Sequence, residues 1–261
     1  MRSVVGGAVA FVISLSLGMT GFDVEEVSAS VAGSRGSHDS AEALRSLLRV
    51  REAELEALRR KVQELEKATE KELYREAEAL GIVREVTQSG LPERQQRRIA
   101  IAIIRESRQN GLDPLLVVAL IRSESSFDNY ARSKVGALGL MQVMPETGRW
   151  IASMHGLRLA KKTHLFDSEL NLEIGTTYLA NLIRRFGGLD AALIAYNAGP
   201  SAARRILADR SAKARFLAGY PRKVVREFQR LKAKTEVSAG DQSRRGRDVS
   251  RSQSHAANRR A

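Results

Sequence analysis

A single glutamate, Glu124, is the residue of this sequence best placed to act as an acid or a base. It ends the apolar run LLVVALIRSE, one helical turn before the chain reaches Phe127-Asp128-Asn129, where we expect the helix to stop. Its carboxyl group would then have apolar helices on one side and a cleft on the other. Loss of water raises a carboxyl pKa, as a general acid near neutral pH requires. The alternative is an ordinary surface glutamate in an i, i+4 pair.

The chain beyond this glutamate contains groups that suit a sugar ligand. Gly136 and Gly139 allow a tight turn in which the backbone can approach a ligand closely, although turn geometry alone would also explain them. Gln142 and Asn197 each carry hydrogen-bond donors and acceptors, which match acetamido and hydroxyl substituents. Capping or loop support is the alternative for both. Tyr196 supplies a ring face and a hydroxyl group.

A second catalytic carboxylate is not evident. Hydrolytic glycosidases use two carboxylates, about 5 Å apart for retention and about 6.5–9.5 Å apart for inversion. None of the acidic residues downstream has a sequence context that pairs it with Glu124. The residues considered are Asp128, Glu146, Asp167, Glu169 and Glu173.

Three motifs follow one another in order from this glutamate onward. Glu124-Ser125-Ser126-Phe127 and residues 131–147 (ARSKVGALGLMQVMPET) come first, then Asn171, Gly175, Tyr178 and Leu179, and then residues 195–200 (AYNAGP). Their order and spacing, across about 130 of the 261 residues, closely resemble the soluble lytic transglycosylase domain of lysozyme-like enzymes that cleave peptidoglycan. The resemblance implies an all-α, lysozyme-like helical domain.

The resemblance also implies a mechanism with one carboxyl group. Glu124 would protonate the glycosidic oxygen and then act as the base toward the 6-hydroxyl group of the N-acetylmuramyl residue. The product would be a 1,6-anhydro sugar, and no water would be consumed. The residues that the resemblance places on the substrate are Ser125, Ser133, Gly139, Met141, Gln142, Tyr196, Asn197 and Tyr220. Core packing is the alternative for Met141.

The sequence departs from the family pattern in two places. Phe216-Leu217 stand where the family has a Glu-Thr pair before its tyrosine, and Pro221 follows Tyr220. Asn129-Tyr130 replace the usual Pro-x in the loop after the catalytic motif. The second change would alter the shape of the substrate subsites without touching the glutamate.

Helices are expected to position these residues. Asn110-Gly111 is a stop signal, and Asp113-Pro114 is an N-cap followed by proline at the first helical position. Glycine and asparagine punctuate the chain up to Leu231, and no period-two strand pattern appears. The sequence therefore predicts an all-helical lytic transglycosylase domain over 91–231.

Residues 41–88 are expected to form a coiled-coil helix. Apolar residues recur at steps of four and three, and Arg51 interrupts one d position. The apolar positions are Leu44, Leu48, Leu55, Leu58, Val62 and Leu65. The alternative is a single solvated helix packed on the next domain. Either helix would position other parts of the protein, with a coiled-coil partner or self-association in the first case.

Both ends of the chain have distinct compositions. Met1-Arg2 precede an uncharged apolar run from Val4 to Met19, which predicts a signal peptide or signal anchor over 1–22. A buried core helix is the alternative. A linker is expected over 23–40 and a disordered basic tail, rich in Ser and Arg, over 232–261. The protein would thus be exported to the periplasm or cell envelope, with an inner-membrane anchor through residues 4–22 if the signal is retained.

The net charge of +13 lies away from the N-terminal half. Residues 112–231 have 18 basic against 10 acidic side chains, and residues 232–261 have 8 against 3. Peptidoglycan, whose peptide stems are acidic, is a suitable partner for such a body. The absence of cysteine excludes disulfides, thiolate ligands and lipidation of a cysteine.

The other function classes are weaker. Four histidines without metal-ligand spacing lead us to expect no metal and no cofactor. We also expect no nucleic-acid partner, because aromatic residues make up 5% of the chain and no nucleic-acid-binding motif occurs. A lysozyme-type hydrolase and a non-catalytic glycan-binding scaffold remain the alternatives to a lytic transglycosylase.

Overall fold

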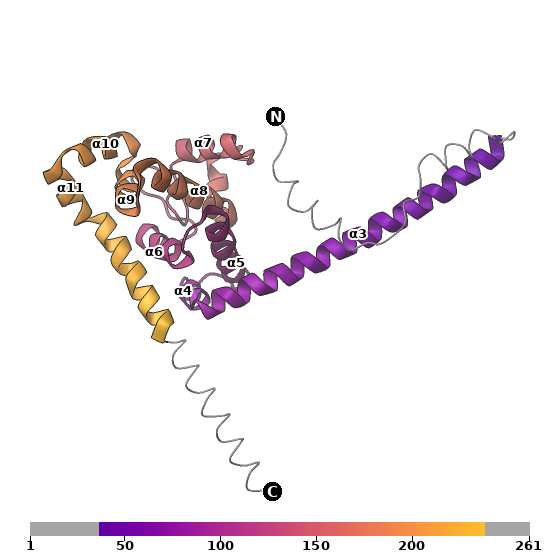
Figure 1. Cartoon of the computed structure of the whole chain (residues 1–261), viewed down its shortest axis with the longest axis horizontal. Helices are drawn as coiled ribbons and strands as arrows, with labels where there is room; N and C mark the ends of the chain where they lie inside the picture. The colour runs from indigo at the N-terminus through magenta and orange to yellow at the C-terminus, as the bar shows by residue number, and fades with distance from the viewer. Residues whose placement is uncertain (1–36, 238–261) are drawn as a thin grey trace, which may run out of the picture. The chain divides into compact units, whose positions relative to one another are not determined.

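The computed structural model describes residues 37–237 (Figure 1). The predicted export signal, most of the linker and the tail beyond residue 237 lie outside the described residues. All regular elements within 37–237 are helices, which confirms the predicted all-α class. The chain divides into two compact units, residues 1–65 and 66–261.

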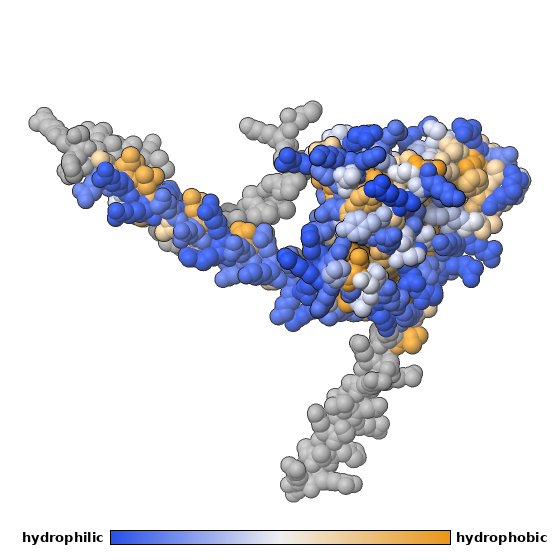
Figure 2. All heavy atoms as spheres, turned by 180° about the vertical axis from the view of Figure 1, so that it is seen from behind, coloured by the Kyte–Doolittle hydropathy of each residue, from blue (hydrophilic) through white to orange (hydrophobic). Residues whose placement is uncertain are grey.

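The first described element is the long helix α3, Ser37–Ala79. Apolar side chains recur along it between polar ones, and they stay exposed up to Leu65 (Figure 2). Leu73 and Ala77, by contrast, belong to the buried core of the second unit. The helix expected over 41–88 is interrupted after Ala79, because Gly81 adopts a φ of 73° that ends one helix and begins the next.

Ten further helical segments follow within the described part of the second unit. They are α4 (Ile82–Thr87), α5 (Glu93–Asn110), α6 (Pro114–Glu124), α7 (Pro145–His155), the 3-10 helix η2 (Lys162–Phe166), α8 (Ser168–Phe186), α9 (Leu189–Ala198), α10 (Pro200–Ala208) and α11 (Arg210–Leu217), and then residues 220–237. The buried core extends from Leu73 to Leu231, so α4 and the last turns of α3 pack with the region predicted as 91–231. Residues 232–237, expected to start the tail, continue the last helix.

Helix α6 lies at the centre of this unit. Every residue from Leu115 to Ile121 is buried, as expected for a helix that is apolar on all sides. The Asp113 side chain caps its start by accepting a hydrogen bond from the Leu115 amide at 2.9 Å. Its last residue is Glu124, so the central helix carries the candidate acid to the edge of the core.

A buried carboxylate, Glu85, connects α4 with α6 and the last helix. It is 2% exposed and accepts hydrogen bonds from Arg122 at 2.6 Å and from Lys234 at 2.8 Å. Arg230 lies 3.6 Å away from the same group. A buried charge is tolerated only with such partners. The cluster therefore holds in place the two helices whose ends form the candidate site described next.

Candidate active site

Glu124 and Tyr220 meet at the centre of the site. The Tyr220 hydroxyl group donates a hydrogen bond to Oε1 of Glu124, although the two residues are 96 positions apart. Tyr220 begins the last helix, and Pro221 fits in its first turn, where no amide donor is needed. The departure from the family pattern at Pro221 therefore leaves the tyrosine in contact with the glutamate.

The surroundings of Glu124 raise the pKa of its carboxyl group. Burial is the dominant cause, while the hydrogen bond from Tyr220 and the ammonium group of Lys223 act in the opposite direction. The upward direction confirms the expectation from the sequence. None of these causes is another carboxylate, so within the described residues the candidate acid has no acidic partner that affects its pKa.

Two tyrosines near the carboxyl group keep their hydroxyl groups protonated. Burial and the nearby Glu124 raise the pKa of both Tyr220 and Tyr196, so each hydroxyl group stays a donor at neutral pH. Tyr196 donates to the Met141 carbonyl oxygen at 2.8 Å. Tyr196 thus supports the loop after α6, while Tyr220 is the tyrosine that donates to the Glu124 carboxyl group.

An aromatic row extends from Tyr196 toward the surface. Its ring centroid lies 5.4 Å from that of Tyr178, and the Tyr178 centroid lies 6.4 Å from that of Trp150 in an edge-on arrangement. Trp150 is 47% exposed. These rings come from α9, α8 and α7. The sequence showed Tyr178 only as part of a motif and did not bring these rings together, because their proximity depends on the packing of three helices.

The chain turns sharply after Glu124. Ser126 and Phe127 adopt φ values of 53° and 69°, in the left-handed region that non-glycine residues rarely occupy. The buried Phe127 ring packs in the core, and the Ser125 hydroxyl group donates to the Leu140 carbonyl oxygen at 2.8 Å. Ser125 therefore fastens the end of α6 to the following loop.

Two other predicted contact residues have polar groups engaged within this loop. The Gln142 amide nitrogen donates to the carbonyl oxygens of Gly139 at 2.9 Å and Ala131 at 3.2 Å. The Ser133 hydroxyl oxygen accepts from the Ala137 amide at 2.9 Å. Loop support, which was the alternative for Gln142, is therefore a role that it has in the structure.

Asn171 joins this loop to α8 from inside the core. Its side chain accepts from the Met141 amide at 2.8 Å and donates to the carbonyl oxygens of Leu138 at 2.9 Å and Leu165 at 2.8 Å. A Cβ atom on Gly139 would overlap both this amide group and the Leu165 carbonyl oxygen. Gly139 is thus required by packing, and Asn171 is a supporting residue that the sequence showed only as part of a motif.

Met141 is fully buried, so the structure favours core packing over a position on the cleft wall. Its sulfur atom would lie only 2.5 Å from a Cβ atom placed on Gly175. Small size at Gly175 therefore allows α8 to approach the loop closely. Close packing therefore explains why glycine stands at position 175 of this motif.

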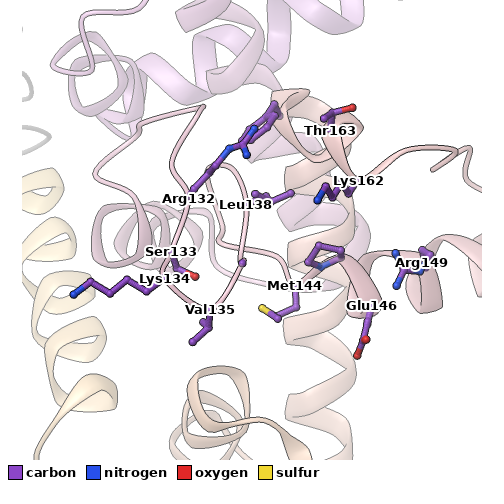
Figure 3. Close-up of a pocket in the computed structure, with 13 residues that line it drawn as sticks. Arg132, Ser133, Lys134, Val135, Leu138, Met144, Glu146, Arg149, Lys162 and Thr163 are labelled. Carbon is purple, nitrogen blue, oxygen red and sulfur yellow. The ribbon is translucent and has the colours of Figure 1, made fainter.

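Two cavities lie where a ligand could reach the loop and the last helix. One, of about 420 Å³, is lined by Ser133, Met144 and Glu146 with several basic side chains (Figure 3). The other, of about 320 Å³, is lined by Asn197 and Tyr220 among others. Of the predicted contact residues, Ser133, Asn197 and Tyr220 are the ones that line these cavities. Within residues 37–237 no cluster of acidic or histidine side chains could hold a metal ion.

Comparisons with known proteins find one family and several individual proteins that are similar to this chain. Residues 101–217 match the family described as "Transglycosylase SLT domain". The membrane-bound lytic murein transglycosylase C of Actinobacillus succinogenes is 38% identical over 115 residues, which cover 40% of this chain and 32% of that protein. This chain therefore spans about a third of the length of that curated relative.

Two solved structures are also similar. The 70 kDa soluble lytic transglycosylase Slt70 of Escherichia coli matches with 24% identity and a TM-score of 0.47, over 63% of this chain and 29% of that one. The lytic transglycosylase Slt of Pseudomonas aeruginosa matches with 24% identity and a TM-score of 0.44, over 82% of this chain and 38% of that one.

Proposed function

We propose, from the match of residues 101–217 to the transglycosylase SLT domain family, that this protein is a lytic transglycosylase of peptidoglycan. Its reaction would cleave the β-1,4 bond between N-acetylmuramic acid and N-acetylglucosamine. The observation that carries this proposal is the environment of Glu124, a carboxyl group with a raised pKa, a tyrosine donor and no acidic partner that affects its pKa.

The proposed mechanism uses this carboxyl group twice. Protonated Glu124 gives its proton to the glycosidic oxygen as the bond from that oxygen to C1 of the muramic acid breaks. The resulting carboxylate then takes the proton of the 6-hydroxyl group, whose oxygen bonds to C1 and closes the 1,6-anhydro ring. The Tyr220 hydroxyl group would stabilise the carboxylate between the two steps. A hydrolase would instead need a water and, in most families, a second carboxylate.

The experiment that tests the proposal is mass spectrometry of the products released from purified sacculi. Anhydromuropeptides are the expected product. Products that end only in reducing muramic acid would contradict the proposal in favour of a lysozyme-type hydrolase. Binding to sacculi without any release, in wild type and in a Glu124 variant alike, would favour the glycan-binding scaffold.

The same geometry supports proposals about which residues contact the substrate. Ser133 and Asn197 line cavities on the proposed substrate path, and Trp150 offers an exposed ring on which a sugar could pack. Ser125, Gly139, Met141 and Gln142 would act by shaping the loop, through their backbone and internal contacts.

Substitution Tyr220→Phe is expected to move the basic limb of the pH profile of kcat/KM to higher pH. The hydrogen bond from Tyr220 lowers the pKa of Glu124, so its loss raises that pKa further and keeps the acid protonated at higher pH. The maximal rate should fall about tenfold, because the carboxylate loses its donor. Initial rates of anhydromuropeptide release across pH would measure both effects. Tyr74→Phe, on α3, is the control, and an unshifted limb in Tyr220→Phe would contradict the assignment.

The place of the protein in the cell is likewise a proposal. Its relative in Actinobacillus succinogenes is described as membrane-bound, which supports a position in the cell envelope. Among the described residues no helix combines the length and apolar character needed to cross a membrane. The proposed signal or anchor at 4–22 lies outside those residues.

We also propose that α3 pairs with α3 of a second copy in antiparallel orientation. The apolar heptad positions form the seam of α3, and these residues are 47–57% exposed. They are Leu44, Leu48, Leu55, Leu58, Val62 and Leu65. In a parallel pair, Arg51 would face the partner's Arg51. In an antiparallel pair with Leu55 opposite the partner's Leu58, Arg51 would instead face the partner's Val62. The flanking pairs are then of opposite charge, namely Arg45 with the partner's Glu66, Glu52 with the partner's Arg59, and Glu54 with the partner's Lys61.

Cysteine pairing would measure this orientation, because the natural chain has no cysteine. A mixture of the single variants Leu55→Cys and Leu58→Cys should form a mixed disulfide, since the two positions face each other in the proposed register. Each variant alone should stay largely uncrosslinked. Disulfides between identical variants would indicate a parallel pair, and monomers throughout would contradict self-association.

A further inference from the structure

A basic groove of about 810 Å³ lies between the end of α6 and the last helix. Its lining includes five basic side chains and a single acidic one. They are Arg122, Arg222, Lys223, Arg226, Arg230 and Glu227. The remaining lining residues are small, so the groove offers charge rather than apolar surface.

The charges of this groove fall into two groups. Arg122 and Arg230 form ion pairs with Glu85 and Glu227. Arg222, Lys223 and Arg226 are exposed and form no ion pair with an acidic group of residues 37–237. Arg222 and Arg226 are four residues apart, a spacing at which like charges repel. The fold therefore keeps together, in about one turn of helix, three cations that form no ion pair among these residues.

This groove adjoins the proposed catalytic group. Ser123 and Ser126, on either side of Glu124 in the chain, line it, as does Gly219 next to Tyr220. The Lys223 ammonium group donates to the Ser123 carbonyl oxygen at 3.1 Å. A substituent of a substrate bound at the Glu124 carboxyl group would therefore be within reach of the groove.

We propose that the groove binds carboxylate groups of the peptide stem carried by the muramic acid residue under attack, an inference that rests on the proposed function. Arginine side chains suit carboxylates, because the planar guanidinium group can donate two parallel hydrogen bonds. The stem branches from the same sugar that closes the anhydro ring, so a groove beside the carboxyl group is in the place that a branch would reach. The protein would thus favour strands that keep their peptides.

Binding of such a carboxylate would also affect the acid itself. The Lys223 ammonium group lowers the pKa of Glu124. A carboxylate bound at Lys223 offsets that positive charge, so the pKa of Glu124 would rise when a peptide-bearing strand is in place. Substrate recognition would then help to keep the general acid protonated.

The test measures binding without turnover, in the full chain with Glu124→Gln. The probes are soluble glycan strands with peptide stems and the same strands after an amidase has removed the stems. We expect the stem-bearing strands to bind about tenfold more tightly at low ionic strength, and the difference to shrink as salt screens the charges. Adding Arg222→Ala and Arg226→Ala should abolish the difference, whereas the matched pair Arg204→Ala and Arg205→Ala on α10 should retain it.

Equal affinity for both kinds of strand would overturn the proposal, as would a preference that survives Arg222→Ala and Arg226→Ala. Vesicles with and without anionic lipid form a third arm. A groove variant that loses vesicle binding but keeps its preference for stem-bearing strands would assign the groove to a membrane surface. Product analysis of the wild-type protein is independent: absence of anhydro products contradicts the proposed function, while the binding ratio still decides the groove.

Discussion

The variant Glu124→Gln should release anhydromuropeptides about 10³- to 10⁴-fold more slowly than the wild type while it keeps its fold. Positioned proton transfer contributes about 10²- to 10⁴-fold to a rate, and here one group performs two transfers. Glutamine has nearly the same size, and its carbonyl oxygen can still accept the Tyr220 hydrogen bond. Mass spectrometry of sacculus digests measures the loss. Glu78→Gln, an exposed change on α3, is the matched control.

The same variant should alter how stability depends on pH. The pKa of Glu124 is raised in the folded state, so folding favours its protonated form. That contribution is complete below the unfolded pKa and is lost as pH rises through the folded pKa. The wild-type protein should therefore lose stability over this range relative to Glu124→Gln. Melting curves from pH 4 to 8 would measure the difference, and parallel curves or residual cleavage close to wild type would contradict the assignment.

Asn171→Ala should lower the free energy of unfolding by about 3 kcal/mol or more, because each of the three buried polar groups that it leaves without a partner costs about 1–3 kcal/mol. The change removes the partner of the Met141 amide and of the Leu138 and Leu165 carbonyl oxygens. Urea unfolding monitored by circular dichroism would measure it.

Asn181→Ala is the control for this change, because Asn181 lies on the same helix and only accepts a hydrogen bond from the exposed side chain of Arg184. We expect its effect to stay within about 0.5 kcal/mol, as for most surface changes. Similar losses for the two asparagines would mean that Asn171 does not hold the loop.

Much of this protein was determined by short-range patterns. The apolar run that ends at Glu124 predicts both a buried helix and a carboxyl group of raised pKa, since burial of the helix and removal of water from its last residue have the same cause. Caps such as Asp113 and the absence of alternation predict the all-α class. Heptad spacing predicts the exposed seam of α3. Each depends on neighbours within a few turns.

Tertiary structure alone decided which side chains meet. Tyr220 donates to Glu124, which lies 96 residues away in the chain. Glu85 accepts hydrogen bonds from cations on two other helices. Gln142 uses its amide group within its own loop, and its residue type does not reveal this. Periodicity states which face of a helix is buried, whereas the partner on that face depends on how all the helices pack together, and no local pattern contains that information.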